Sequence, residues 1–141
     1  TGFANGTFGG KDVSQPTHFE IYGDAPEALA AFYAAVLGWR IEKAPGVDYW
    51  RIALDAPQGA GMRAGGIAFR PAMDIKGWLM FVEVPSVEAA LVAAEAHGGT
   101  MLRERSAVPR TAWYAVVADP AGNPFGMWQP DATAMPLPIP D

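Results

Sequence analysis

The first regular hydrophobic pattern in the chain covers residues 17–22, where polar and apolar side chains alternate. This two-residue period is typical of a β-strand with one face toward a core. Phe19 and Ile21 fall on the apolar face. The polar face is the candidate site, and it carries His18, Glu20 and Tyr22.

A helical pattern follows this strand at once. Asp24 is expected to cap its N-terminus, Pro26 suits the first turn, and Gly38 can adopt the left-handed conformation that ends a helix. Between these ends, apolar side chains recur at the spacings of an amphipathic helix: Leu29, Phe32, Tyr33, Val36 and Leu37. Further strands are then expected at 39–43, 49–54 and 67–70.

The same order of elements is repeated in the second half of the chain, where Ser86 can cap a second helix. Aligning Glu27 with Glu88 gives the same offset as aligning Gly38 with Gly99, because 88 − 27 and 99 − 38 both equal 61. The sequence therefore predicts an α+β fold, with two tandem βαβββ modules forming a curved mixed sheet around a cavity. The strands expected in the second module are 78–84, 100–103, 113–118 and 125–129.

These patterns divide the chain into a flexible N-terminal arm, one domain of two modules and a proline-rich C-terminal tail. The arm is rich in glycine and small polar residues, which favours a loose segment. The glycine-rich stretch 59–66 is expected to form an edge of the cavity. The expected boundaries are 1–16 for the arm, 17–129 for the domain with modules 17–70 and 77–129, and 130–141 for the tail.

Composition and charge narrow the classes of partner. Hydrophobic residues make up 50% of the 141 residues and charged ones 18%, a composition that builds a core. The net charge of −5 argues against nucleic acid and against an anionic membrane surface. No apolar run approaches the roughly 20 residues that span a bilayer, so a cytoplasmic location is expected. The chain has no cysteine, which excludes thiolate nucleophiles and cysteine metal sites.

Aromatic and small residues of the later strands are expected on the concave side of the sheet. By alternation, Trp78, Met80 and Trp128 should line the cavity with Tyr22, either as a binding surface for a flat apolar molecule or as core. Gly126 has no side chain and would leave space between these residues. Three arginines could receive an anionic group or simply remain solvated: Arg51, Arg103 and Arg105.

Five segments carry a resemblance to a known family: THFEI, APEALAAFYAAVLGW, GGIAFRP, VPSVEAALVAAEAHGG and DPAGNPFGMWQ. In their order and duplication, the chain resembles the vicinal oxygen chelate superfamily, which contains glyoxalase I, extradiol dioxygenases and the bleomycin and fosfomycin resistance proteins. The resemblance covers about residues 17–129. It implies a small-molecule ligand and a homodimer, because members commonly pair as dimers.

The resemblance also implies where a metal would be held. Metal enzymes of the family take histidine and glutamate ligands from both modules, and His18 lies at the place of the first ligand. The position near Trp78 has no histidine, residues 64–69 contain no carboxylate, and Gly126 stands where a glutamate is expected. A catalytic metal needs about three protein donors. We therefore expect no cofactor, with a divalent metal held through His18 and Glu20 as the alternative.

Three functions remain open at this point. The leading one is a small-molecule-binding protein of the glyoxalase and bleomycin-resistance type, which acts by sequestration without metal and uses His18 and Glu20 to orient the ligand. The alternative is a lyase or isomerase that moves a proton next to a carbonyl, with His18 or Glu20 as base or weak metal ligand. The third is an accessory module whose cavity is filled and whose strand edges or tail bind a partner.

Overall fold

The computed structural model describes residues 13–54, 62, 64–71, 75 and 77–136. Most of the expected arm, residues 1–12, and much of the glycine-rich stretch lie outside them. In chain order, the described elements are β1 (Pro16–Tyr22), α1 (Pro26–Leu37), β2 (Arg40–Lys43), β3 (Tyr49–Ala53), β4 (Ala64–Ala68), β5 (Gly77–Glu83), α2 (Val87–Ala96), β6 (Thr100–Val108), β7 (Ala112–Ala118) and β8 (Pro124–Pro130).

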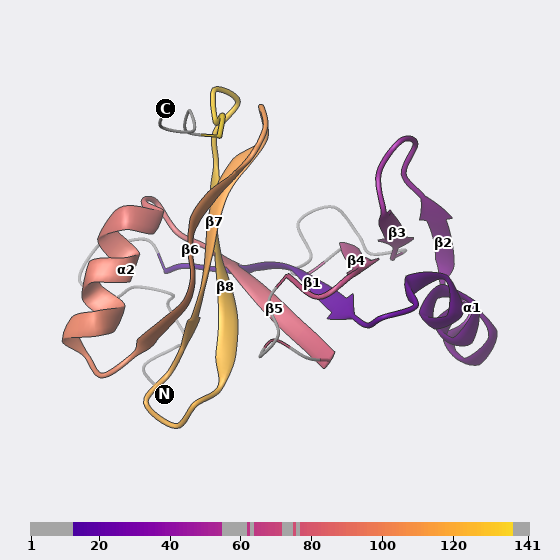
Figure 1. Ribbon diagram of the computed structural model, residues 1–141, viewed down its shortest axis with the longest axis horizontal. Coiled ribbons are helices and arrows are strands. Elements are labelled where there is room, and N and C mark those ends of the chain that lie inside the picture. Colours follow the sequence, from indigo (N-terminus) through magenta and orange to yellow (C-terminus); the bar gives the residue numbers. More distant parts are fainter. Residues whose placement is uncertain (1–12, 55–61, 63, 72–74, 76, 137–141) are drawn as a thin grey trace.

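Two βαβββ modules form one mixed sheet of eight strands in the described part of the chain, in the order β2-β3-β4-β1-β5-β8-β7-β6. β1 and β5 pair antiparallel at its centre, while β1 runs parallel to β4 and β5 parallel to β8. The first residues of β1 and β5, Pro16 and Gly77, keep the expected offset, since 77 − 16 is 61. Figure 1 shows the two modules at opposite ends of the long axis. The expected fold class is confirmed.

Alternate strand residues form a separate core under each helix. Phe19, Ile21 and Ile52 are buried in the first module, with Leu29 and Tyr33 of α1 packed against them. In the second module, Ala115, Val117 and Met127 are buried together with Val87 at the start of α2. Residues that pair across neighbouring strands point to the same face, so the ladders place both helices on one face of the sheet. The opposite face is left for the candidate site.

The two helices begin differently, which corrects one expectation. The N-cap of α1 is Ala25, which makes no side-chain capping hydrogen bond, and not Asp24. The Asp24 carboxylate instead accepts a hydrogen bond from Nη1 of Arg70 at 2.7 Å. Ser86 does cap α2, since its hydroxyl accepts a hydrogen bond from the backbone amide of Ala89 at 3.1 Å. The contact between Arg70 and Asp24 could not be predicted from neighbouring residues in the sequence. The carboxylate pairs with this arginine and does not cap the helix.

We expect Ser86→Ala to lower the free energy of unfolding by about 1 kcal/mol, the typical cost of losing a serine cap. Asp24→Ala should cost less, because its ion pair with Arg70 is exposed and such pairs contribute about 0.2–1 kcal/mol. Urea denaturation of both variants checks this order. A larger loss for Asp24→Ala would mean that the Asp24 carboxylate stabilises the start of α1 after all.

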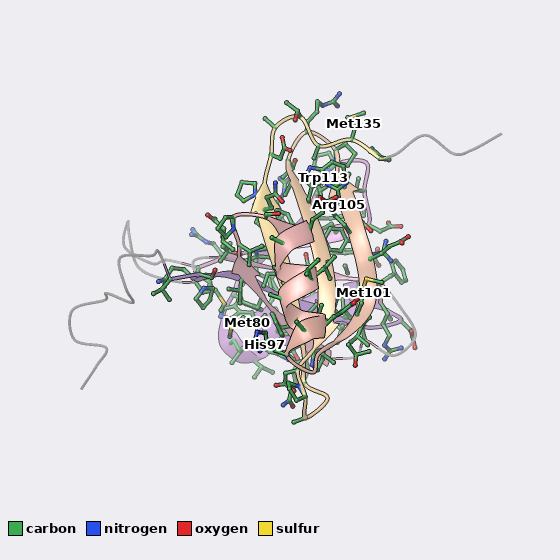
Figure 2. The ribbon with its side chains drawn as sticks, turned by 90° about the vertical axis from the view of Figure 1, so that its left-hand side faces the viewer. Met80, His97, Met101, Arg105, Trp113 and Met135 are labelled. Atoms are coloured by element: carbon green, nitrogen blue, oxygen red, sulfur yellow. The ribbon has the colours of Figure 1, made fainter. Side chains whose placement is uncertain are left out.

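The second module differs from expectation at β6. This strand continues to Val108, whereas the expected strand ended at residue 103, and its pairing with β7 is irregular around Arg103. Arg105 lies on the helix side of the sheet (Figure 2), 4.1 Å from the ring centroid of Trp113 and in an ion pair with Glu88 at 3.4 Å. Arg105 therefore binds α2 to the sheet and does not face the concave side.

The helices of the structure give no sign of a membrane span. Among the described residues, no helix is long and apolar enough to cross a bilayer.

The start of the tail, which the sequence predicts as an extended segment, contains turns at 132–133 and returns to the domain. Ala134 is buried there, and its carbonyl accepts a hydrogen bond from the amide of Arg110 at 2.7 Å.

Candidate functional site

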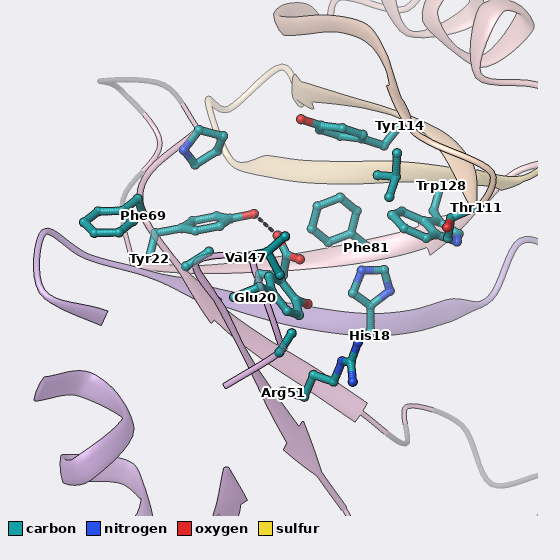
Figure 3. A pocket seen from close by; sticks show the side chains of 15 residues that line it. His18, Glu20, Tyr22, Val47, Arg51, Phe69, Phe81, Thr111, Tyr114 and Trp128 are labelled. Atoms are coloured by element: carbon teal, nitrogen blue, oxygen red, sulfur yellow. Dashed lines mark hydrogen bonds between the residues drawn. The ribbon is translucent and has the colours of Figure 1, made fainter. Parts of the chain in front are cut away.

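The polar face of β1 lines a cavity of about 530 Å³ on the side of the sheet away from the helices. His18, Glu20 and Tyr22 point into it, as their two-residue spacing requires (Figure 3). The cavity receives residues from both modules, and its volume suits a small organic molecule. The other lining residues are Ala44, Val47, Tyr49, Arg51, Ala68, Phe69, Pro71, Phe81, Val108, Thr111, Tyr114 and Trp128.

Glu20 is held between two phenols. The hydroxyl of Tyr22 donates a hydrogen bond to Oε1 of Glu20 at 2.5 Å, and the hydroxyl of Tyr49 donates another to the same carboxyl group. Burial raises the pKa of Glu20 above its usual value, although both hydrogen bonds act in the opposite direction. Burial and the neighbouring carboxylate also raise the pKa of each phenol, so both tyrosines remain donors. The arrangement fixes one carboxyl group in a half-buried aromatic setting.

The imidazole of His18 lies between two aromatic rings. It stacks on Phe81, with ring centroids 4.6 Å apart and planes inclined by 6°, and it meets the edge of Trp128 at 4.8 Å. Burial lowers the pKa of His18 to about 4, so the ring is neutral at pH 7. His18 therefore offers this cavity a neutral hydrogen-bonding ring and no positive charge.

Thr17 engages one nitrogen of the His18 ring. Its hydroxyl lies 2.8 Å from Nδ1 of His18 and 3.4 Å from the carbonyl oxygen of Phe81. In the tautomer with the proton on Nδ1, the hydroxyl accepts from Nδ1 and donates to the Phe81 carbonyl, and the lone pair is on Nε2. Nε2 can accept a hydrogen bond or a proton from a bound molecule.

Aromatic rings occupy the space beside two glycines on the concave face. A Cβ atom at Gly126 would overlap the ring of Phe81, and one at Gly66 would overlap the phenol of Tyr49. Gly126 is the position at which the family resemblance implied a glutamate ligand. The glycine there allows the ring of Phe81 to lie against the sheet and to support His18. Ligand positions of the metal enzymes are thus filled by rings in this chain.

The residues present do not fit the metal site that the resemblance implies. Within the described part of the chain, no group of three or more histidine, aspartate or glutamate side chains is placed to hold a metal ion. His18 and Glu20 are the two such donors on the cavity, and Glu20 already accepts hydrogen bonds from two phenols. About three fixed protein donors are needed for an open catalytic site.

The expectation that Trp78 and Met80 line the cavity is wrong. In the antiparallel β1–β5 ladder, Glu20 pairs with Leu79 and Ile21 with Trp78, so Leu79 shares the face of the cavity and Trp78 the face of the helices. Trp78 stacks on Phe19 with centroids 5.2 Å apart, and its Nε1 donates to the hydroxyl of Tyr33 at 3.2 Å. Met80 follows the same alternation and is also absent from the cavity wall.

Several residues of the cavity were not singled out in the sequence, and Tyr49 and Phe81 matter most. Both had a signal: Phe81 is the 61-residue equivalent of Glu20, because 81 − 20 is 61, and Tyr49 alternates with Arg51 on a strand. Arg51 lines the cavity, whereas Arg103 lies behind it, 5.5 Å from the ring centroid of Tyr114, and donates to the carbonyl of Pro71. A second hollow of about 600 Å³ adjoins the first and shares His18, Tyr49, Arg51 and Trp128 with it.

Fold and cavity together define a glyoxalase-like protein. Residues 20–127 match the glyoxalase-like domain family, and the chain belongs to this family. The resemblance to the vicinal oxygen chelate superfamily is thereby confirmed. A curated relative, "Putative glyoxylase CFP32" of Mycobacterium bovis, is 29% identical over 115 residues, which are 79% of this chain and 42% of that protein. The chain thus spans about two fifths of the length of the curated relatives that it matches.

Solved structures share the fold at low sequence identity. A glyoxalase/bleomycin resistance protein/dioxygenase superfamily member from Vibrio splendidus 12B01 is 16% identical, with a TM-score of 0.56 over 83% of this chain and 99% of that one. A variant of Streptomyces coelicolor methylmalonyl-CoA epimerase is 13% identical, with a TM-score of 0.55 over 84% and 99%. At these identities the likeness concerns the fold, and the chemistry must be argued from this cavity.

Proposed function

We propose that this chain is a small-molecule-binding domain that holds its ligand in the concave cavity without a metal. The observation that carries the proposal is the composition of the wall: rings from both modules surround the two fixed polar groups of Glu20 and His18. Apolar walls contribute affinity in proportion to the area they bury, and a few placed polar groups give orientation. Binding followed by sequestration needs no more than this.

Each polar group has a defined task in this proposal. Nε2 of His18 accepts a hydrogen bond from the ligand, because Nδ1 is engaged with Thr17. Glu20 keeps lone pairs beyond those that accept from Tyr22 and Tyr49, since a carboxylate has about four acceptor positions. A ligand with a flat apolar body and a polar end satisfies both groups and the rings between them.

A thermal-shift screen of small aromatic and carbonyl compounds, in the presence of EDTA, tests this proposal. A true ligand at 100 times its Kd should add about 2.7 kcal/mol to the free energy of unfolding, which is several degrees in Tm for a domain of this size. His18→Ala should lose part of the shift, whereas His97→Ala, an exposed change at the end of α2, should keep it. A shift that appears only with added divalent metal would contradict the metal-free proposal.

A second function is favoured by one observation, a neutral His18 whose Nδ1 is engaged with Thr17. In this position Nε2 of His18 can accept a proton from a carbon next to a carbonyl and return it to the same or a neighbouring atom of the substrate. Deuterium exchange into a bound carbonyl compound, followed by NMR, separates the two functions. Exchange that depends on His18 would make the domain an isomerase or lyase, and exchange at the rate of free solution would leave binding alone.

A further inference from the structure

Glu20 has hydrogen-bond donors around it but no ion-pair partner. Tyr22 and Tyr49 are neutral phenols, and within the described residues no lysine or arginine forms an ion pair with Glu20. The exposed Arg51 shares the concave face but lies two strands away, across Gly66. Glu20 is also the one carboxylate among the residues that line the cavity. A buried carboxylate is stabilised by a positive charge near it, which a bound cation would supply.

The rest of the wall has the character that a cation prefers. In Figure 3 the Glu20 carboxyl lies between the rings of Tyr22 and Phe81, and the ring of Tyr114 stands across the cavity. The faces of aromatic rings carry partial negative charge and attract ammonium groups. A carboxylate set among rings therefore recognises a positive charge attached to apolar material, through both contacts at once.

We propose that the ligand of this cavity carries a positively charged nitrogen, an amine or a quaternary ammonium group, on a flat apolar body, and that Glu20 binds this nitrogen. The proposal rests on the small-molecule-binding function above and names its class of ligand. An amine would donate to the free lone pairs of Glu20. A quaternary ammonium group would use the same charge and the ring of Tyr114, which lines the cavity, without hydrogen bonds.

Arg51 sets the direction in which such a ligand lies. Its side chain is exposed and borders both hollows, whereas Glu20 belongs to the first alone. A positive ligand is repelled by Arg51 and attracted by Glu20, so its nitrogen should lie at the Glu20 end. Removing the charge of Arg51 by Arg51→Gln should therefore tighten cation binding.

The affinity for a cation should rise with pH. The titratable or charged groups that face Glu20 are His18 and Tyr22 on β1, Tyr49 and Arg51 on β3, and Tyr114 on β7. Above its pKa of about 4, His18 is neutral. Glu20 gains its negative charge as the pH rises through a pKa that burial raises above its usual value. Binding that depends on this charge strengthens as the pH rises through that pKa.

The test compares four probes of similar size by isothermal titration calorimetry at pH 8: benzyltrimethylammonium, benzylamine, benzyl alcohol and benzoate. We expect at least one cation to bind about tenfold tighter than benzyl alcohol, and benzoate to bind most weakly. Glu20→Gln should remove the preference, while Glu42→Gln, which deletes an exposed carboxylate on β2, should keep it. For a Glu20→Gln protein that does not fold, the ranking of the four probes on the wild type carries the test.

Three results would overturn the proposal. If benzyl alcohol or benzoate binds as tightly as both cations, the charge preference is wrong and small-molecule binding still stands. If none of the probes binds at millimolar concentration while the thermal-shift screen finds an uncharged ligand, the cation inference alone fails. If the screen also finds nothing, the proposed function fails with it.

Discussion

Acidification from pH 7 to pH 4 is expected to lower the free energy of unfolding by about 2 to 3 kcal/mol through His18 alone. Its pKa falls from 6.5 to about 4 in the folded protein, because the ring is buried between Phe81 and Trp128. In the unfolded chain His18 binds a proton below pH 6.5, whereas in the folded protein it binds this proton only below about pH 4. Each unit of difference corresponds to about 1.4 kcal/mol, reduced here because the ring is partly accessible. The stability is present above pH 6.5 and is lost as the pH falls toward 4.

Chemical denaturation of wild type and His18→Phe across this pH range measures the effect. Phenylalanine keeps a ring against Phe81 but cannot titrate, so the stability of the wild type relative to the variant should fall by about 2 to 3 kcal/mol as the pH falls from 7 to 4. Glu20 works in the opposite direction, since its raised pKa adds stability on acidification, and the comparison of two curves removes its contribution. His97→Phe serves as the control, because His97 is exposed at the end of α2. An NMR titration of His18 with a midpoint near 6.5 would contradict the prediction.

Gly126→Ala is expected to destabilise the protein by about 1 to 3 kcal/mol, the usual cost of overpacking. The new methyl group would overlap the ring of Phe81, which is 2% exposed and cannot move away without entering the cavity. Phe81 also stacks on His18, so a displaced ring should weaken ligand binding as well. Gly66→Ala should behave in the same way in the first module, where the phenol of Tyr49 stands in the path of the methyl group.

A double-mutant cycle with Phe81→Leu distinguishes overpacking from a general intolerance of alanine at Gly126. The smaller leucine leaves room for the methyl group, so the double variant should be more stable than the sum of the single changes predicts. Urea denaturation of the four proteins gives the coupling free energy. Strict additivity would show that the ring of Phe81 is not what excludes a side chain at Gly126.

The fold could be predicted from the sequence because its signals are local and occur twice. The alternation from His18 to Tyr22, the helix stop at Gly38 and the 61-residue offset each rest on a few neighbouring residues. Which residues of β5 face the cavity could not be predicted in this way. Trp78 and Leu79 are both apolar, so which of them faces the cavity is decided by pairing with β1 and not by composition.

The candidate site was predictable in part, for a related reason. His18, Glu20 and Tyr22 follow from the period of one strand, whereas Tyr49 reaches Glu20 from β3, two strands away across β4. The packing of Phe81 beside Gly126 depends on a ring in one strand and a missing side chain in the next. Contacts between residues of different strands produce no periodic pattern in the sequence.

The central pair of strands has a consequence for the way in which a ligand can be oriented. Phe19 and Met80 pair across it and are also equivalent positions, because 80 − 19 is 61, so a local pseudo-dyad passes between them. The backbones on the two sides of this pseudo-dyad are similar, but their side chains differ. Glu20 in one module corresponds to Phe81 in the other, and His18 corresponds to Leu79. Along the central pair of strands, a ligand that touches both modules meets the imidazole and carboxyl groups of one and the apolar side chains of the other. The cavity between the two similar modules is therefore polar on one side of the pseudo-dyad and apolar on the other. A ligand that binds in one orientation does not fit equally well when it is turned end for end.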